Sequence, residues 1–307
     1  MSGMRESILK KLSPRVLSPE QVASYHREGM LVVRDFFTKK EEAVVVGATD
    51  DIQAFPEEWG KQMIYFEPGP MGGRQLYRTE NYIPYHPGLR ELLEGKVIDA
   101  VSDLLGEPAV LFKEKINWKF KGAGGFGPHQ DSPAYCEFPQ KTFLSAMISA
   151  DQSTMENGCL EMVRGKHRNG IVPQNSDGTI RTDLCEQYEW EPLLVGPADI
   201  CFFSADTPHR SGRNNSQGSR RAHFLTFNPE SEGRHREAYF AEKRKKFPPL
   251  FEMEPGKDYS EGARIYNAGT TPCIVTPCTV GSAPSSSVES TEAVSVSEEE
   301  DTSDQTA

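Results

Sequence analysis

Apolar residues recur at two different spacings along the 307-residue chain, and the spacing changes near Pro108. Up to that point most apolar positions follow the three-to-four-residue repeat of helices that bury one face. Ser18 and Pro19, followed by Gln21, form a good helix start, and the periodic segment closes at Gly29. The elements expected here are helices over residues 19–28 and 39–54, one or two more helices over residues 87–105, and a strand over residues 30–37.

After residue 108, short apolar or alternating segments dominate, separated by glycine, proline and asparagine. Alternation with a period of two indicates a half-buried strand, and a short continuous apolar run fits a fully buried one. The expected strands are residues 110–120, 142–150, 158–163, 199–203 and 221–227. Many short strands are typical of a β-sandwich or β-barrel, so the sequence predicts a mainly β domain with helices packed outside it.

The composition changes again at residue 281. Residues 281–307 contain seven acids, no lysine or arginine and no aromatic residue. Such a segment cannot bury a core, so we expect one domain, residues 1–280, followed by a disordered acidic tail, residues 281–307. The tail carries seven of the eleven net negative charges, which leaves residues 1–280 near −4. So mild a charge does not suggest a nucleic-acid partner.

The chain has no apolar run of 18 residues and no apolar core of a signal peptide at its N-terminus. We therefore expect a soluble, cytoplasmic protein without a membrane partner. The six cysteines form no Cys-x-x-Cys pair, which favours reduced thiols over a disulfide framework. The sequence leaves the oligomeric state open.

The candidate chemistry is concentrated in three residues. His129 and Asp131 are two positions apart, and His209 follows the apolar run 198–203. In an extended strand, positions two apart point to the same side, so His129 and Asp131 can hold one ion while Gln130 faces away. Two imidazoles and one carboxylate form the ligand set that binds ferrous iron and leaves coordination positions open.

A His-x-Asp pair alone is a weak signal, and the residues around it strengthen the case. Residues 121–128 are rich in glycine and contain a proline, which favours a loop at the rim of a site over a regular strand. Histidines without such a context are expected to be structural or surface residues. These are His26, His86, His167 and His235.

Two further segments point to a family. Residues 156–161, Glu-Asn-Gly-Cys-Leu-Glu, precede Gly-Lys-His at 165–167, and His-Arg-Ser-Gly at 209–212 leads to residues 218–222. Over about residues 15–250 the chain resembles the phytanoyl-CoA dioxygenase family of iron(II)- and 2-oxoglutarate-dependent oxygenases. The resemblance implies a double-stranded β-helix, the jelly-roll or cupin-like fold. Arg164 and Lys166 stand where the family usually has proline and serine, and neither position is a metal ligand.

The resemblance implies a role for each site residue. His129, Asp131 and His209 would hold Fe(II), with 2-oxoglutarate chelating the metal and O2 taking the remaining position. Arg220 would receive the distal carboxylate of 2-oxoglutarate, since a guanidinium offers two parallel hydrogen bonds, and Ser211 would contact the same group. Oxidative decarboxylation would then oxidise a substrate C–H bond, with ascorbate as the reductant in assays. Related halogenases lack the carboxylate ligand, so Asp131 favours oxygen transfer, or another outcome of hydrogen abstraction, over halogenation.

Residues 113–121 hold the best clue to the substrate. Alternation places one set of polar side chains on one face, namely Lys113, Lys115, Asn117, Lys119 and Lys121. We expect Lys113, Lys119 and Lys121 to line solvent. Asn117 fits the position from which the family contacts 2-oxoglutarate, and Lys115 would bind either 2-oxoglutarate or a carboxylate, phosphonate or phosphate of the substrate. The sequence thus predicts a small, polar, anionic or zwitterionic substrate.

Other charged segments receive simpler interpretations. Residues 74–82 are expected to form a lid or substrate wall, because loops at the mouth of such folds carry specificity. Residues 241–247 are interpreted as the solvated end of a helix. Arg221 points away from Arg220 on a strand and is expected at the surface.

Three functions compete at this point. The leading one is a hydroxylase of a small metabolite. The second is the same chemistry on an acyl-CoA or lipid, which is disfavoured because no extended apolar or adenine-binding stretch stands out. The third is a catalytically silent protein that binds metal and 2-oxoglutarate, and the complete set of His129, Asp131, His209 and Arg220 speaks against it.

Overall fold

The computed structural model describes residues 16–69 and 72–267. Its helices are α2 (Pro19–Glu28), α3 (Lys39–Gln53), α4 (Pro87–Leu92), α5 (Ile98–Leu105), α6 (Thr182–Cys185), α7 (Arg236–Lys246) and α8 (Ser260–Tyr266). Its strands are β1 (Met30–Val33), β2 (Met63–Pro68), β3 (Arg74–Glu80), β4 (Ala109–Lys119), β5 (Phe126–His129), β6 (Leu144–Ser149), β7 (Leu160–Met162), β8 (Glu191–Leu193), β9 (Ile200–Ser204), β10 (His209–Ser211) and β11 (Arg220–Pro229). The acidic tail predicted at residues 281–307 lies outside the described residues, so the boundary at 280 stays a prediction.

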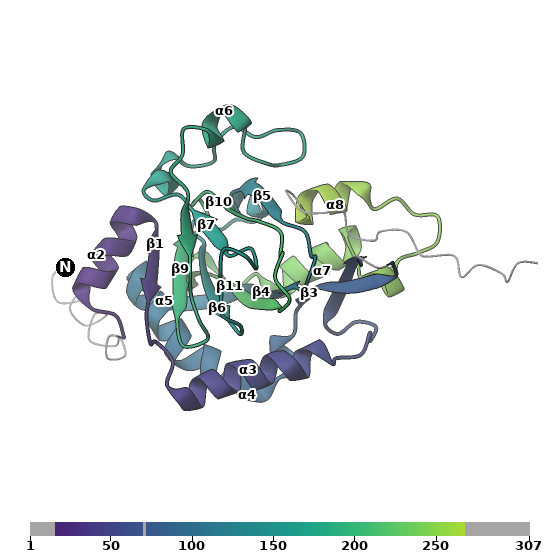
Figure 1. The fold of residues 1–307 in the computed structure, drawn as a ribbon, viewed down its shortest axis with the longest axis horizontal. Coiled ribbons are helices and arrows are strands. Elements are labelled where there is room, and N and C mark those ends of the chain that lie inside the picture. Colours follow the sequence, from purple (N-terminus) through teal and green to yellow (C-terminus); the bar gives the residue numbers. More distant parts are fainter. Residues whose placement is uncertain (1–15, 70–71, 268–307) are drawn as a thin grey trace, which may run out of the picture. The chain divides into compact units, whose positions relative to one another are not determined.

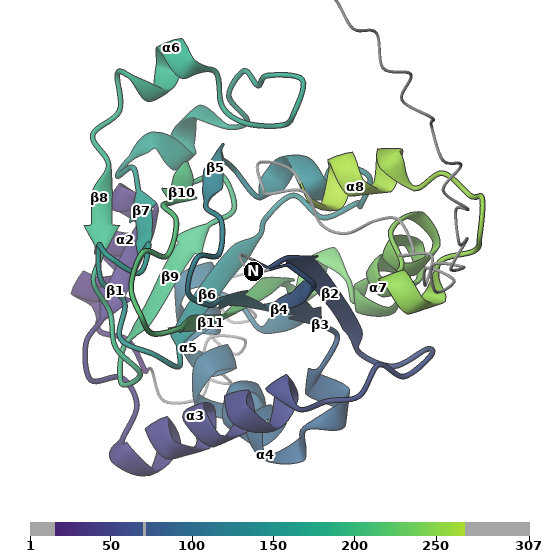
Figure 2. The same cartoon turned by 45° about the vertical axis from the view of Figure 1, so that its right-hand side comes forward.

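These strands form two sheets in which neighbouring strands run antiparallel. The larger sheet has the order β1-β9-β6-β11-β4-β3-β2, and the smaller one has the order β5-β10-β7-β8. Met147 and Phe203 of the larger sheet share a buried cluster with Leu160 and Leu193 of the smaller one, so the two sheets pack face to face. The predicted jelly-roll of antiparallel strands with outer helices is confirmed (Figures 1 and 2).

The outer face of the larger sheet is the main apolar layer of the molecule. Leu225 of β11 and Trp118 of β4 point to this face and share a buried cluster with helix residues such as Ile52 of α3 and Val101 of α5. Figure 1 shows α3, α4 and α5 against this side of the sheet. Each fully buried large apolar side chain contributes about 1.5–3 kcal/mol, so this layer between sheet and helices is a major source of stability.

The first helix follows the sequence prediction closely. Ser18 caps α2 in a capping box with Gln21, and Gly29 ends the helix with a left-handed φ of 74°. A Cβ on Gly29 would lie 2.2 Å from the ring of His167, so the glycine is also required for close packing. His167 therefore packs against the end of α2. The helix predicted over 39–54 is α3, which ends one residue earlier.

Several predicted elements differ from the structure. The strand predicted over 30–37 stops at Val33, because Asp35 adopts a φ of 50° and the chain turns. Residues 87–105, predicted as one or two helices, are two, joined by a π-helical turn at Leu93–Val97. Residues 74–82, expected as a loop, form β3, which pairs with β2 and β4 inside the larger sheet.

The glycine-rich segment before His129 is partly a strand rather than only a loop. β5 begins at Phe126 and includes Gly127 and Pro128. At Gly125 an added Cβ would lie 2.6 Å from the carbonyl oxygen of Ser211, so glycine lets the chain enter β5 in close contact with β10. The glycines thus serve the approach of two strands.

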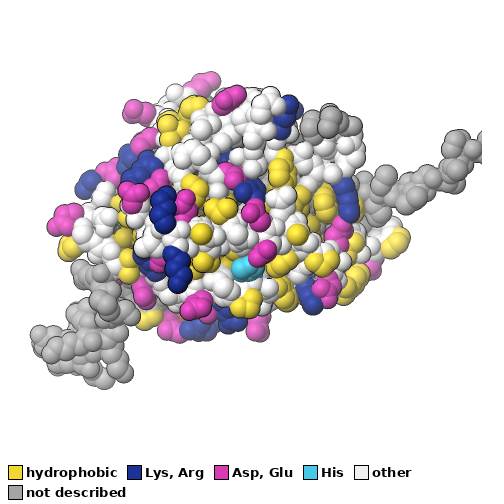
Figure 3. Space-filling model, turned by 60° about the horizontal axis from the view of Figure 1, so that its bottom comes forward, with side chains coloured by type: hydrophobic (Ala, Val, Ile, Leu, Met, Phe, Trp, Pro, Cys, Tyr) yellow, Lys and Arg dark blue, Asp and Glu magenta, His cyan; other side chains and the backbone are white. Residues whose placement is uncertain are grey.

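Charged and apolar side chains are mixed on the face of the molecule that Figure 3 draws. On the face drawn in Figure 3, acidic and basic side chains are interspersed with scattered hydrophobic ones, without a continuous basic area of the kind that follows a nucleic-acid backbone. Over residues 16–69 and 72–267, none of the helices combines the length and the apolar character needed to cross a bilayer. The four cysteines in these ranges are free thiols.

Candidate metal centre

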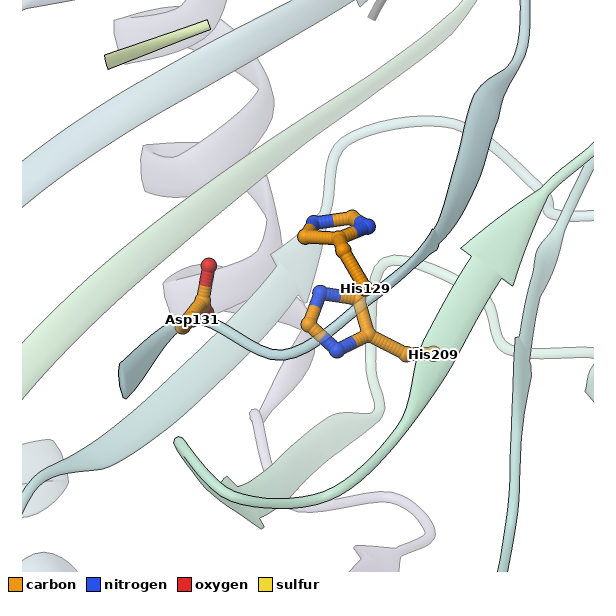
Figure 4. Close-up of side chains that lie close together, drawn as sticks. All are labelled: His129, Asp131 and His209. Atoms are coloured by element: carbon orange, nitrogen blue, oxygen red, sulfur yellow. The ribbon is translucent and has the colours of Figure 1, made fainter. Parts of the chain in front are cut away.

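Three potential metal ligands meet between the two sheets. His129 ends β5 and His209 begins β10, and these residues are partners in the pairing of the two strands. The pairing brings their ring centroids to 4.2 Å. The ligand atoms of His129, Asp131 and His209 all lie within 4.8 Å of one another, and all three side chains are buried. Figure 4 shows the two rings next to each other, with Asp131 beside them.

Asp131 reaches the site by a different route from the one the sequence predicted. β5 ends at His129, and Asp131 has helical φ and ψ values of −78° and −32° at the start of a turn. Its backbone N–H donates to the carbonyl oxygen of Ala205 at 2.9 Å, which fixes the turn against the loop before His209. Gln130 does face away, because its Nε2 donates to the carbonyl oxygens of Gly170 and Asp206.

The hydrogen bonds of the two histidines prepare them for metal binding. Nδ1 of His129 lies 2.7 Å from the carbonyl oxygen of Gly127, and Nδ1 of His209 lies 3.0 Å from that of Thr207. A proton on each Nδ1 leaves Nε2 as the ligand atom. Burial lowers the pKa of His129 to about 3, and it also lowers the pKa of His209. Both imidazoles are therefore neutral near pH 7, as metal ligands must be.

The acidic ligand is also in its binding form. Burial alone would raise the pKa of Asp131, but the combined effect of its neighbours lowers it. The largest of these effects comes from Lys115, whose Nζ lies 4.0 Å from Oδ1, and Lys113 and the two histidines add to it. Two neutral imidazoles and one carboxylate, with room left for further ligands, suit Fe(II). The donor set present in the chain thus fits the metal that the sequence predicted.

A second group of polar side chains lies deeper between the sheets. Arg220 of β11 is 1% exposed, and its Nε and Nη1 have no hydrogen-bond partner among the described residues. Unpaired buried N–H groups are rare and each costs about 1–3 kcal/mol, so they indicate an anionic ligand. Burial lowers the pKa of Arg220 to about 10, which leaves it charged at pH 7. This guanidinium fits the distal carboxylate of 2-oxoglutarate.

Lys119 completes this group, and the expectation that it lines solvent was wrong. It lies opposite Arg220 in the pairing of β4 with β11 and is 2% exposed. Its Nζ donates to Oγ of Ser211 at 2.9 Å and to the carbonyl oxygen of Gly212. Burial, together with the charge of Arg220, lowers the pKa of Lys119 to about 6. Lys119 thus joins Ser211 and Arg220 in one polar cluster.

The same correction applies to Lys113, which is 5% exposed, whereas Lys121 beyond the end of β4 is exposed as expected. The sequence placed these lysines on one face correctly, but it assigned Lys113 and Lys119 to solvent while assigning Lys115 of the same face to the site. The face opposite carries Ile116 and Trp118, which pack under the helices. Because that apolar face is the outer one, the cationic face has to point between the sheets. The alternation of the two faces was visible in the sequence, whereas the packing of the helices on the apolar face was not.

A cavity of about 170 Å³ opens beside His129 and Asp131. The cationic side chains in its lining are Arg78, Lys113, Lys115, Lys243 and Arg264. Lys243 had been assigned to a solvated helix end, but it is buried in α7, and its Nζ lies 2.6 Å from both carboxylate oxygens of Glu80. Residues 74–82 therefore do form a wall of the site, as a strand.

Two further residues of the sequence analysis have clear positions. Asn117 points between the sheets, and its Oδ1 accepts a hydrogen bond from Nε of Arg78 at 3.3 Å. Arg221 points to the opposite face, as predicted, but it is not freely solvated. It pairs with Asp151 at 2.8 Å and with Asp50 at 2.5 Å, and its side chain is 13% exposed.

Together, the jelly-roll and the buried two-histidine, one-carboxylate cluster define the class of iron(II)- and 2-oxoglutarate-dependent oxygenases. The comparison with known proteins agrees with this class and identifies one family within it. The family model described as "Phytanoyl-CoA dioxygenase (PhyH)" matches residues 25–222, and the chain belongs to this family.

Curated relatives cover most of the chain. It is 42% identical to a 2-aminoethylphosphonate dioxygenase of the uncultured bacterium HF130_AEPn_1, over 81% of this chain and 96% of that protein. It is 38% identical to a methylphosphonate hydroxylase of Gimesia maris, over 75% of this chain and 88% of that protein. The protein is thus a 2-oxoglutarate-dependent dioxygenase, and the family predicted from the sequence is confirmed.

Solved structures share the fold. The crystal structure of EctD from S. alaskensis with 2-oxoglutarate and 5-hydroxyectoine aligns with a TM-score of 0.61 at 20% identity, over 72% of this chain and 79% of EctD. The structure of SnoN, an epimerase of nogalamycin biosynthesis that depends on α-ketoglutarate, aligns with a TM-score of 0.57 at 20% identity, over 68% and 80% of the two chains. These structural similarities support the jelly-roll fold described above.

Proposed function

We propose that this dioxygenase hydroxylates a C–H bond of a small organophosphonate or a closely similar anion. One observation carries the proposal: five cationic side chains line a cavity of about 170 Å³ directly beside the metal ligands. The two relatives described above, whose names specify phosphonate substrates, support the same substrate class. The predicted small, anionic or zwitterionic metabolite thus takes a specific chemical form.

The site residues have distinct proposed roles. His129, Asp131 and His209 hold Fe(II) through two Nε2 atoms and one carboxylate oxygen. Arg220 pairs with the distal carboxylate of 2-oxoglutarate, and Ser211 contacts the same group. When bound, Fe(II) and 2-oxoglutarate supply the oxidation, in which O2 gives one oxygen atom to succinate, with loss of CO2, and one to the substrate as a hydroxyl group. In assays ascorbate keeps the iron reduced.

Two residues of β4 lie where cosubstrate and substrate would meet. Asn117 faces the interior and is proposed to contact 2-oxoglutarate, held in place by Arg78. Lys115, with its Nζ 4.0 Å from Asp131 and its side chain in the cavity lining, is proposed to contact the anion nearest to the metal. Two residues of one strand would thus orient the two anions around the iron ion: Asn117 contacts 2-oxoglutarate, and Lys115 contacts the anion nearest to the metal.

The dimensions of the cavity argue against an acyl-CoA or lipid substrate. Sites for drug-sized ligands are about 300–1,000 Å³ and mostly apolar. The cavity here is smaller, and cationic side chains provide much of its lining. A compact anion fits this space and charge.

The experiment is a screen of the purified protein with Fe(II), ascorbate and 2-oxoglutarate. The substrates are 2-aminoethylphosphonate, methylphosphonate and β-alanine, the last being a carboxylate of similar size. We expect succinate formation to rise with one of the phosphonates, together with a product that has gained one oxygen atom by mass spectrometry. Succinate that responds to none of the phosphonates, or an oxygenated product from β-alanine alone, would contradict the proposal.

A further inference from the structure

We infer that Lys113 is the receptor for the doubly charged head group of the substrate, and that no carboxylate of the cavity recognises a cationic group at the other end. This inference rests on the proposed function and adds to it the residue and the part of the substrate that determine specificity. Binding then requires the anionic head group of the substrate, whereas an ammonium group at the other end of the substrate is tolerated but not needed.

Lys113 differs from the other buried cations of the cavity in having no polar partner. It is 5% exposed and lines the cavity, yet its Nζ makes no hydrogen bond or ion pair with any of the described residues. Its neighbours are aromatic faces, with Nζ 5.0 Å from the ring centroid of Tyr135 and 6.0 Å from that of Tyr239. These contacts hold the ammonium in place without neutralising it.

The neighbouring cations are already paired or committed. Lys243 contacts both oxygens of Glu80 at 2.6 Å. Arg78 donates to Asn117, to the carbonyl oxygen of Tyr266 and to the hydroxyl of Tyr77. Lys115 is nearest to Asp131, at 4.0 Å. Arg264, the fifth cation of the lining, is exposed to solvent. Lys113 is therefore the buried cation of the described lining that makes no hydrogen bond or ion pair.

A buried ammonium without a direct partner is costly, because it has lost water, and the carboxylates of Asp131 and Glu80 attract it only from beyond ion-pair distance. An anion that enters the cavity removes this cost. A phosphonate offers two negative charges on three oxygens, so it can contact Lys113 and Lys115 at the same time, since the two side chains point into the same cavity from one strand. A neutral group of equal size cannot compensate the charge of the two lysines.

The acidic residues of the lining explain the second half of the inference. They are Glu80 and Asp131. Glu80 is 1% exposed and already neutralised by Lys243, with Arg78 at 3.6 Å, and Asp131 belongs to the metal centre. A substrate ammonium therefore finds no free carboxylate in this lining. The ring of Tyr266 already has Nζ of Lys243 at 5.1 Å from its centroid, so the open side of the cavity is left for the ammonium.

The first test compares two lysine variants of the full chain. Lys113→Met keeps the length of the side chain but removes the charge, and Lys121→Met removes an exposed lysine from the same face beyond β4. Affinity for 2-aminoethylphosphonate is measured by titration calorimetry without oxygen, in protein loaded with Fe(II) and 2-oxoglutarate. The Kd of 2-oxoglutarate is measured separately.

We expect Lys113→Met to raise the Kd of 2-aminoethylphosphonate about 10- to 100-fold, as for loss of a charge-assisted hydrogen bond. The Kd of 2-oxoglutarate and the thermal midpoint should stay near those of the unmodified protein, and Lys121→Met should change neither Kd. An equal loss of affinity for both ligands, or no change for the phosphonate, overturns the role of Lys113. If Lys113→Met folds poorly, Lys113→Gln is measured in the same way.

The second test varies the ligand. Ethylphosphonate lacks the amine, and the diethyl ester of 2-aminoethylphosphonate keeps the amine but loses the charge on phosphorus. We expect ethylphosphonate to bind within about tenfold of 2-aminoethylphosphonate and the ester to show no binding, because one ion pair is worth at least about a factor of ten. If the ester binds more tightly than ethylphosphonate, the inference about the anionic and cationic ends of the substrate is wrong.

The two levels of the proposal fail separately. If the unmodified protein oxidises a phosphonate but Lys113→Met binds it equally well, the inference is wrong and the proposed function stands. If the unmodified protein neither binds nor oxidises a phosphonate, the proposed function fails and the inference fails with it.

Discussion

The two faces of strand β4 perform opposite tasks. Ile116 and Trp118 point outward into the apolar layer beneath the helices. Lys113, Lys115 and Lys119 alternate with them and point between the sheets, where all three line the site. Along β4, the apolar packing is therefore on the outer face, and the inner face is free to hold charges. The comparison teaches that a strand with one apolar face need not present its polar face to water.

β11 repeats the same division one strand away. Arg220 points inward with two unpaired N–H groups, whereas Arg221 points outward and pairs with Asp151 and Asp50. Two adjacent arginines thus have unrelated tasks, because consecutive side chains of a strand point to opposite faces. The following predictions test this division, from the largest expected effect to the smallest.

The strongest disturbance of the inner side is Asp131→Ala, which leaves two imidazoles as metal ligands. We expect turnover of 2-oxoglutarate to fall by at least about a thousandfold, because a bound metal supplies several kcal/mol of the catalysis. Bound iron, measured by elemental analysis, should fall with it. Asp183→Ala, at an exposed carboxylate of α6, should leave both unchanged. Full turnover in Asp131→Ala would place the metal elsewhere.

Trp118→Ala disturbs the outer face of β4 instead. Trp118 is 1% exposed, and its Nε1 donates to Oγ1 of Thr79 at 2.9 Å. We expect the free energy of unfolding, measured with urea, to fall by about 3–5 kcal/mol because a large cavity is left in the apolar layer. The KM for 2-oxoglutarate should change by less than about twofold in protein that remains folded. A selective loss of affinity for 2-oxoglutarate would contradict the division of faces.

Arg220→Lys and Arg221→Lys separate the two faces of β11. We expect Arg220→Lys to raise the KM for 2-oxoglutarate about 10- to 100-fold, since an ammonium cannot form the two parallel hydrogen bonds of a guanidinium. Arg221→Lys should leave this KM unchanged and lower the thermal midpoint instead. Steady-state kinetics at varied 2-oxoglutarate measures the first effect. Equal KM values for the two variants would refute the assignment.

Asp151→Asn tests the outer ion pairs through pH. Burial alone would raise the pKa of Asp151, but hydrogen bonds from Arg221 and Ser219 outweigh it and lower the pKa below 3.8. A lowered folded pKa stabilises the protein above the unfolded value, and this stabilisation is lost as the pH falls below about 3.8. The unmodified protein should therefore lose more stability than Asp151→Asn between pH 5 and pH 3, by at most about 1 kcal/mol, measured by urea unfolding. Identical pH profiles would exclude this contribution.

Much of the architecture could be predicted from local patterns. The capping residues of α2 fixed its start and end, and alternation identified β4, β6, β9 and β11 to within a few residues. Shorter elements were less predictable. β5 contains glycine and proline, and it is a strand because β10 pairs with it. Residues 74–80 form a strand because β2 and β4 lie on either side of it.

By itself the sequence determined which residues can take part in the chemistry. The two histidines, the carboxylate and the arginine are recognisable from residue type and spacing. It also determined which residues share a face, because a strand fixes the direction of successive side chains. Only the tertiary structure decided which face is the interior. That choice depends on where α3, α4 and α5 pack, and it converted Lys113 and Lys119 from expected surface residues into buried parts of the site. Burial is a property of the whole fold, and the chemistry of a lysine depends on it.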